Sequence, residues 1–334
     1  MTKLTVKNWI NQELVKYARK APSNCLSAAL QLATLHLLTS GLARNIDEES
    51  FTGALLGSFC SKCNICATAF SHTNQSSLTW RRHNKNSQEK DGEKLSGADF
   101  TLILRLRNNF AKAAIFQAKN SKSDVGSFDA GHISPPIDEG DAELQFLRLK
   151  EYSMTTLSKT GIGQAKSIDE LHWVHYLIYH DYSAYCCALS TMVDLDDKAK
   201  LGHPLGTIRF KERANVSFID LLADGASIST DDGWLILDSV EKIKLFVSKS
   251  RDMFNVYEAR AEADCQWEPI ASDDSLPILR SQAVAMVRSA LVPAESQERD
   301  TENSSNDDNG SAQPPPPEES NGVGAGQPTR KLRL

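Results

Sequence analysis

Three polar side chains lie near the two ends of a segment that has the pattern of a β-hairpin. The segment spans residues 97–120, with Asp99 near its start and Gln117 and Lys119 near its end. Its two apolar stretches, 98–107 and 112–120, enclose an Asn-Asn pair of the kind that favours a tight turn. A hairpin in simple register pairs positions whose numbers sum to about 217, which predicts that Asp99 faces residue 118.

This set of side chains suits the metal-dependent hydrolysis of a phosphodiester. A carboxylate and a neighbouring oxygen can hold a hard divalent cation such as Mg²⁺ or Mn²⁺. Gln117 and Lys119 share one face of a strand because side chains alternate along it. An ammonium group there could orient or help to activate a water molecule, or stabilise charge on the attacked phosphorus.

An ordinary structural explanation of the same residues is also open. A strand can begin with Asp because of a turn, and a lysine at the end of a strand often serves only to solvate an edge. However, a charged lysine that directly follows an apolar run is costly unless it has a partner or a ligand. The apolar run that ends in Lys119, together with the basic sequence around it, therefore favours a catalytic role for these residues.

Asp99, Gln117 and Lys119 resemble the motif of the PD-(D/E)xK, or restriction-endonuclease-like, nuclease superfamily. The sequence departs from the plain pattern at Gln117, where an acid is usual, and so resembles the Gln-x-Lys variant. The resemblance covers about residues 45–192. It implies an α/β fold in which a mixed β-sheet is flanked by helices.

The Gln-x-Lys variant implies a further acid from a preceding helix. We expect Glu49 to supply this acid, with Glu48 and Glu93 as alternatives. In this assignment Glu49, Asp99 and Gln117 hold the metal, and Lys119 positions the attacking water.

The hairpin lies in a basic part of an acidic chain. The net charge is −6, yet residues 79–122 contain ten Lys or Arg and four Asp or Glu. Local charge decides whether a polyanion binds. We expect phosphate contacts, which give affinity without sequence information, from Arg81, Arg82, Lys85, Arg105 and Arg107.

The resemblance implies a Mg²⁺- or Mn²⁺-dependent endonuclease, acting on DNA rather than RNA, in a setting such as anti-phage (antiviral) defence. One alternative is a non-catalytic nucleic-acid-binding or adaptor protein that keeps a nuclease-like scaffold. Such an adaptor would need no metal and would still bind nucleic acid after Lys119→Ala. The other alternative is an interaction module stabilised by zinc at a cluster of cysteines.

The cysteine cluster consists of Cys60, Cys63 and Cys66. Thiolates at this spacing could bind zinc or an iron–sulfur cluster, if a fourth ligand came from a residue such as Cys25, His72, His83 or Cys265. A helix continuing from Glu48 to Ala69 would instead place the three cysteines on one apolar face, where free cysteine packs well. We expect packing, because no second Cys-x-x-Cys pair is present.

The remaining pattern predicts three parts. Residues 1–44 form a helical N-terminal region, with helices within 6–20 and 25–41; residues 45–293 form the α/β domain; residues 294–334 form a disordered acidic and proline-bearing tail that could tether a protein partner. Within the domain we expect helices at 142–158, 167–181 and 217–227 and a buried strand at 182–193. The helix at 167–181 would carry His172, His175 and His180 at helical spacing, as ordinary packing residues.

Some functional classes are disfavoured by composition. No apolar run approaches the roughly 18–20 residues that span a membrane, and the N-terminus lacks the apolar core of a signal peptide. Seven cysteines without a short disulfide framework indicate a reducing compartment. We therefore expect a cytoplasmic protein without a membrane partner.

Overall fold

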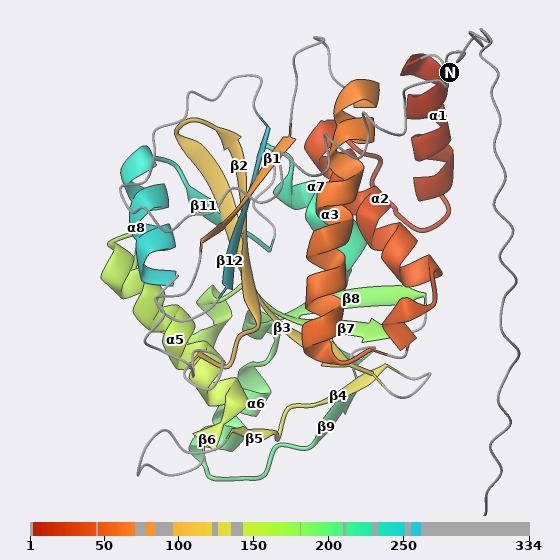
Figure 1. Ribbon diagram of the computed structural model, residues 1–334. Helices are drawn as coiled ribbons and strands as arrows, with labels where there is room; N and C mark the ends of the chain where they lie inside the picture. The colour runs from red at the N-terminus through yellow and green to blue at the C-terminus, as the bar shows by residue number, and fades with distance from the viewer. Residues whose placement is uncertain are drawn as a thin grey trace, which may run out of the picture. The chain divides into compact units, whose positions relative to one another are not determined.

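A mixed β-sheet with helices on both faces organises the chain (Figure 1). The computed structural model describes residues 3–44, 46–70, 78–83, 96–121, 126–134, 143–180, 182–209, 212–228, 233–250 and 255–261. All of them belong to one unit, residues 1–287. The proposed tail at 294–334, together with Lys85, Glu93, His72 and Cys265, lies outside the described residues.

The main sheet has the strand order β1-β12-β2-β3-β7-β8-β10, with β11 paired to β3. Its strands are β1 (Leu78–His83), β2 (Phe100–Arg107), β3 (Phe110–Asn120), β7 (Val174–His180), β8 (Ser183–Ala188), β10 (Val216–Ser217), β11 (Leu235–Leu237) and β12 (Asn255–Ala261). β2 and β3 form the antiparallel hairpin, and β3 runs parallel to β7. Two small sheets pair β4 (Ser127–Asp129) with β9 (Thr207–Arg209) and β5 (Ile133–Ser134) with β6 (Glu143–Leu144).

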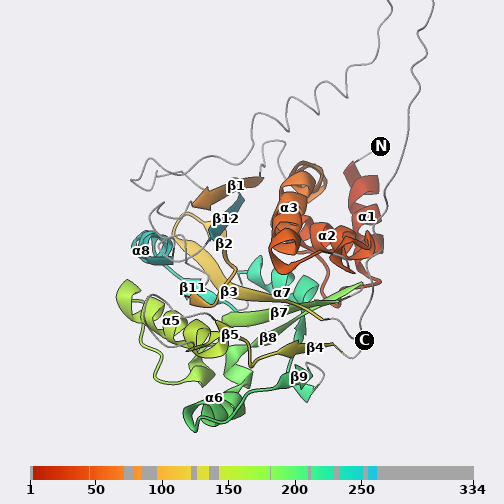
Figure 2. The same ribbon diagram turned by 60° about the horizontal axis from the view of Figure 1, so that its bottom comes forward.

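Helices cover the two faces of the sheet in two groups, as both views show (Figures 1 and 2). One group consists of α1 (Lys3–Leu14), α2 (Cys25–Thr39), α3 (Glu48–Phe70) and α7 (Phe218–Gly225). The other consists of α5 (Gln145–Thr160), α6 (Val193–Lys200) and α8 (Val240–Ser250). Each group encloses a separate hydrophobic core against its own face of the sheet.

The alternation of β3 explains why its polar residues can stand on one face. Phe116 and Ala118 belong to the core beneath α2 and α7, whereas Ala113 and Ile115 belong to the core beneath α5 and α8. Because side chains alternate, Gln117 and Lys119 continue the Ala113–Ile115 face. The strand is therefore buried on both faces until its last residues, where Lys119 and Asn120 become partly exposed.

The hairpin confirms the predicted pairing, with a shift of one residue. Phe100 pairs with Phe116, so the numbers of paired residues sum to 216 along most of the ladder. The sum becomes 217 at Arg107 and Phe110, after a register shift between Arg105 and Arg107. An irregularity of this kind is the β-bulge that bends and twists an edge of a hairpin. Extended by one residue, this register places Asp99 beside Gln117, and the two side chains are hydrogen-bonded.

One predicted element is wrong. Residues 167–181 were expected to form a helix, but they form a short 3₁₀ turn at Ile168–Glu170 and then strand β7. Residues 174–179 are all buried and are rich in aromatic and β-branched side chains. A strand between two helical layers is apolar on both faces, so its sequence lacks the alternation that identifies a half-buried strand. The predicted helices at α2, α3, α5 and α7 and the strand at β8 are confirmed.

Candidate active site

Asp99 precedes β2 and is held against the end of β3 by hydrogen bonds. Its backbone N–H donates to the carbonyl of Phe116 at 2.9 Å. Its Oδ2 accepts from the side-chain Nε2 of Gln117 at 3.0 Å and from the backbone N–H of Ala118. Two donors on one carboxylate oxygen fix the orientation of the carboxylate.

Lys119 meets an acid from the first turn of α3. Its Nζ lies 3.2 Å from Oε2 of Glu48, and the backbone N–H of Asn120 donates to Oε1 of the same residue at 3.3 Å. The Lys119 side chain is 12% exposed and that of Glu48 is 35% exposed. The pair therefore lies at the border between the core and solvent, where a ligand could reach it.

The sequence around Glu48 explains why α3 begins beside β3. Asp47 precedes the helix, and its Oδ1 accepts from the backbone N–H of Ser50 at 2.7 Å, as an N-cap does. The carbonyl of Ile46 accepts from Asn120 Nδ2 and from the Tyr179 hydroxyl, each at 3.3 Å. These contacts anchor the start of α3 to the ends of β3 and β7, and so fix Glu48 beside Lys119.

Gln117 has an unused acceptor. The residue is fully buried, and its Nε2 donates to Asp99 and, at 3.2 Å, to the carbonyl of Ala118. Its Oε1 is buried without a hydrogen-bond partner among the described residues. A buried amide oxygen without a partner costs free energy. An amide oxygen next to a carboxylate is also a hard ligand of the kind that Mg²⁺ and Mn²⁺ prefer.

Two further residues near Asp99 were not singled out from the sequence. Tyr176 pairs with Gln117 in the β3–β7 ladder, and its ring stacks on Phe128 with centroids 4.8 Å apart. Burial, followed by the negative charges of Asp129 and Asp99, raises the pKa of the Tyr176 hydroxyl far above its usual value. Asp129, an exposed residue on β4, therefore adds its negative charge to that of Asp99 beside the same phenol.

The sequence contained little that could reveal these two residues. Tyr176 lies in a segment predicted to be a helix, and Asp129 lies outside the predicted helices and strands. Tyr176 comes close to Asp99 because β3 pairs in parallel with β7. The position of Asp129 depends on the antiparallel pairing of β4 with β9, two strands about 80 residues apart in the chain. Long-range pairing of this kind leaves no local sequence signal.

Of the two candidate acids that the structure describes, Glu48 is the one that contacts the hairpin. Glu49, which the sequence analysis favoured, is exposed, and no hydrogen bond or ion pair joins it to Asp99, Gln117 or Lys119. A helix turns by about 100° per residue, so the neighbouring side chain must point elsewhere when Glu48 faces β3. Glu93 lies outside the described residues.

The arginines that were expected to bind phosphate differ in exposure. Arg82 and Arg107 are exposed, and Arg82 lies over the ring of Tyr257, 5.9 Å from its centroid. Arg81 is partly buried. Arg105 is only 3% exposed, so its guanidinium is not presented to a polyanion in this arrangement.

Arg105 belongs instead to a buried ionic cluster with His83 and Glu258. Its Nη1 lies 3.5 Å from Glu258 Oε1, and its Nη2 donates to the carbonyl of Asn108 at 2.6 Å. His83 Nε2 lies 3.0 Å from the other oxygen of Glu258. Burial alone would raise the pKa of Glu258, but the hydrogen bond with His83 and the positive charges of His83, Arg105 and Arg81 hold it below its usual value.

The cysteine cluster lies on α3, as the packing interpretation predicted. Cys63 and Cys66 are buried and Cys60 is partly buried; Cys63 Sγ accepts from Trp80 Nε1 at 2.9 Å. Burial raises the pKa of the Cys60 thiol to about 11 and those of Cys63 and Cys66 to about 12. Of the possible fourth ligands, His83 is already engaged with Glu258. Within the described part of the chain, no group of three or more His, Cys, Asp or Glu side chains could hold a metal ion.

Two findings concern features outside this site. Within the ranges that the structure describes, no helix has both the length and the apolar character needed to cross a membrane. No family model matches the sequence, and the searches of curated proteins and of solved structures found no match either.

Proposed function

We propose that the chain is a nuclease that uses Mg²⁺ or Mn²⁺ to hydrolyse phosphodiester bonds, in DNA rather than RNA. The observation that carries this proposal is that two pairs of side chains, Asp99 with Gln117 and Lys119 with Glu48, lie at the same end of the hairpin. Asp99, Gln117 and Lys119 stand at one end of the β2–β3 hairpin, and Glu48 joins them from the start of α3. The resemblance to the Gln-x-Lys variant, with its acid from a preceding helix, agrees with this arrangement.

The residues present fit a hard divalent cation. Asp99 and Glu48 would provide carboxylate oxygens, and Gln117 would provide the amide oxygen that is buried without a partner among the described residues. Such a cation would act as a Lewis acid on a phosphate oxygen and would favour deprotonation of a water molecule. Asp129 is a further acid close enough to act on the same phenol as Asp99.

The protein's own groups have separate roles in this proposal. The Gln117 amide and the Ala118 N–H hold the Asp99 carboxylate in one orientation, which removes reorganisation from the reaction step. Lys119 would position the attacking water and stabilise negative charge on the phosphate. Its present partner is Glu48, so a bound cation would draw Glu48 away from Lys119 and leave the ammonium group available.

Substrate contacts away from the reacting phosphate would come from exposed cations. Arg82 and Arg107 fit this role by exposure, whereas Arg105 does not. Contacts of this kind bind the backbone and carry no sequence information. A role in anti-phage defence, with a protein partner tethered by residues 294–334, is part of the same proposal. It fails if removing that segment changes neither activity nor any partner interaction.

A second candidate is a binding or adaptor protein that retains the scaffold without catalysis. One observation favours it: Lys119 pairs with Glu48, and Asp99 already accepts two hydrogen bonds, so the cluster is largely satisfied by itself. An adaptor would bind nucleic acid equally well with or without a divalent cation.

The test is cleavage of plasmid DNA, linear duplex DNA, single-stranded DNA and RNA with Mg²⁺ or Mn²⁺. We expect cation-dependent cleavage by the full chain and its loss in both Asp99→Ala and Lys119→Ala. Equal cleavage by the wild type and both variants would indicate a contaminating nuclease and overturn the assignment. Cation-independent binding without cleavage by any version would instead support the adaptor.

A further inference from the structure

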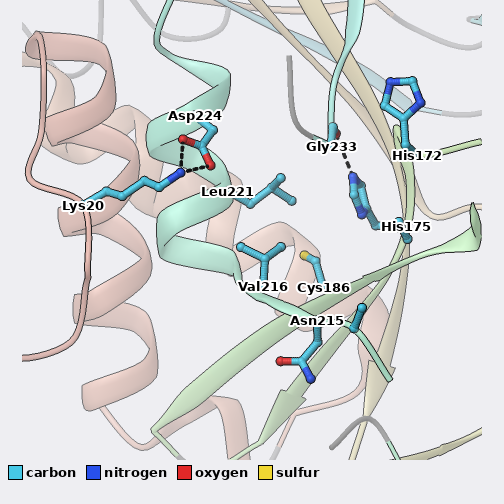
Figure 3. Close-up of a pocket in the computed structure, with 11 residues that line it drawn as sticks. Lys20, His172, His175, Cys186, Asn215, Val216, Leu221, Asp224 and Gly233 are labelled. Atoms are coloured by element: carbon cyan, nitrogen blue, oxygen red, sulfur yellow. Dashed lines mark hydrogen bonds and ion pairs between the residues drawn. The ribbon is translucent and has the colours of Figure 1, made fainter. Parts of the chain in front are cut away.

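A cavity of about 500 Å³ opens on the face of the sheet opposite Gln117 and Lys119. It lies between α7, the segment that joins α1 to α2, and strands β7 and β8 (Figure 3). Cavities that bind small organic molecules have volumes of roughly 300–1,000 Å³ and combine apolar walls with a few polar groups. The cavity is therefore large enough for a ligand of the size of a nucleoside.

His175 lines the cavity and has one buried ring nitrogen without a hydrogen-bond partner among the described residues. His175 is 1% exposed, and its Nε2 lies 2.8 Å from the carbonyl oxygen of Gly233. A carbonyl can only accept, so Nε2 carries the proton. Burial lowers the pKa of His175 to about 4, so the ring is neutral near pH 7 and Nδ1 keeps a lone pair. Nδ1 is buried and has no hydrogen-bond partner among the described residues.

The opposite wall carries an ion pair, and apolar groups lie between the two walls. Lys20 Nζ binds both carboxylate oxygens of Asp224, at 2.5 and 2.6 Å. Figure 3 shows Leu221, Val216 and Cys186 between this pair and His175. Burial raises the pKa of the Cys186 thiol well above its usual value, so Cys186 is a neutral, weakly polar part of the floor.

Ring contacts and a hydrogen bond hold the walls of the cavity in place. The His175 ring stacks on Phe116 with centroids 5.5 Å apart, and Phe116 contacts Phe100, Phe218 and Trp234 in turn. On the other side, the buried Lys112 of β3 donates to the backbone carbonyl of Asp224 at 2.9 Å. A cavity with such walls is preformed, so a ligand would not have to order it.

We propose that this cavity binds a small heteroaromatic molecule of the nucleobase or nucleoside class that presents an N–H donor to His175 Nδ1. A flat ring suits the apolar space between Leu221, Val216 and Cys186. An N–H group would satisfy the buried acceptor, which a ligand without a hydrogen-bond donor could not do. Lys20 at the rim would face the polar part of the ligand. The proposal is independent of whether the chain cleaves nucleic acid.

The first test is binding of adenosine, guanosine and cytidine to the full chain, measured by saturation-transfer NMR in the presence of EDTA. We expect at least one of them to bind at about 1 mM or below. For adenosine, the matched probe is purine riboside, which lacks the exocyclic amino group. If adenosine binds, losing that N–H donor should weaken binding about 3- to 10-fold, the effect of one hydrogen bond.

Substitutions in the protein test whether the nucleoside binds in this cavity. Ala214 is exposed and lines the cavity, so Ala214→Trp should block it without disturbing a core; Thr155→Trp, on an exposed position of α5, is the control. We expect Ala214→Trp to abolish binding and Thr155→Trp to leave it unchanged. His175→Phe should remove the preference for the amino-bearing probe. Absence of binding by all three nucleosides, or binding that Ala214→Trp does not change, would overturn the proposal.

Discussion

Acidic and basic side chains pair near both ends of β2, and the two sets differ in how completely they are buried. At the start of β2, the candidate active site contains Lys119 and Glu48 with side chains 12% and 35% exposed. Near the other end, the ionic cluster contains Arg105, His83 and Glu258 with side chains 1–3% exposed. Residue types alone cannot distinguish these sets, since both combine acids with bases.

The difference in burial indicates a different role for each set. A buried ion pair holds the fold in one arrangement because breaking it leaves a charge without compensation. A pair at the border of solvent can exchange its partner for a cation or a phosphate at small cost. We therefore expect the ionic cluster to govern stability and the candidate active site to govern activity.

The largest effect is expected from breaking the ionic cluster. Glu258→Ala leaves Arg105 and His83 buried without their carboxylate, and should lower the free energy of unfolding by about 3–5 kcal/mol. The control is Glu13→Ala, which removes an exposed i,i+3 pair with Lys16 and should cost less than about 1 kcal/mol. Urea unfolding measures both. Equal losses in the two variants would show that the cluster has no special structural role.

The next effect concerns Lys119. Lys119→Met removes the ammonium group but keeps the apolar stem, and should slow cleavage about 100- to 1,000-fold, as expected for loss of one charge-stabilising group. Stability should change little. Lys159→Met, at an exposed position of α5, is the matched control and should cleave at the wild-type rate. A Lys119→Met variant that cleaves as fast as the control would exclude Lys119 from the reaction.

A smaller effect, on the Mn²⁺ requirement of cleavage, should distinguish Glu48 from the neighbouring Glu49. Glu48→Gln should raise the Mn²⁺ concentration needed for half-maximal cleavage about 10-fold, because one anionic ligand is lost. Glu49→Gln changes an exposed side chain outside the cluster and should change that concentration less than about twofold. Cleavage rates measured across a Mn²⁺ titration give both values. The reverse order would restore the assignment of Glu49.

The smallest effect concerns the stability of the protein at acidic pH. The pKa of Glu258 is lower in the folded protein than its ordinary value of 4.5, so its contribution to stability is complete above that value and is lost as pH falls through the folded pKa. Stability should therefore fall more steeply below about pH 4.5 in the wild type than in Glu258→Gln, which cannot titrate. Urea midpoints measured between neutral and acidic pH test this. Parallel curves would show that Glu258 does not contribute to acid sensitivity.

Local patterns predicted much of this molecule. The Asn108–Asn109 turn and the hairpin depend on residues close together in the chain, and both are present. The same locality explains why Asp99, Gln117 and Lys119 could be grouped from the sequence. The mixed sheet flanked by helices also agrees with the prediction.

The remaining features depend on burial and distant pairing. β7 was mistaken for a helix because it is buried on both faces and shows no alternation. The choice between Glu48 and Glu49 depends on the rotation of α3 about its axis, which the contacts of Ile46 with Asn120 and Tyr179 determine. Arg105 was assigned to phosphate because its partner, Glu258, lies about 150 residues away in the sequence.

The most direct test compares Lys119→Met with Glu258→Gln in one assay of Mn²⁺-dependent plasmid cleavage, with each rate divided by the folded fraction at the assay temperature. The account predicts that Lys119→Met is folded and nearly inactive. It also predicts that Glu258→Gln is less stable but cleaves at close to the wild-type rate per folded molecule. Normal cleavage by Lys119→Met, or loss of cleavage per folded molecule in Glu258→Gln alone, would contradict it.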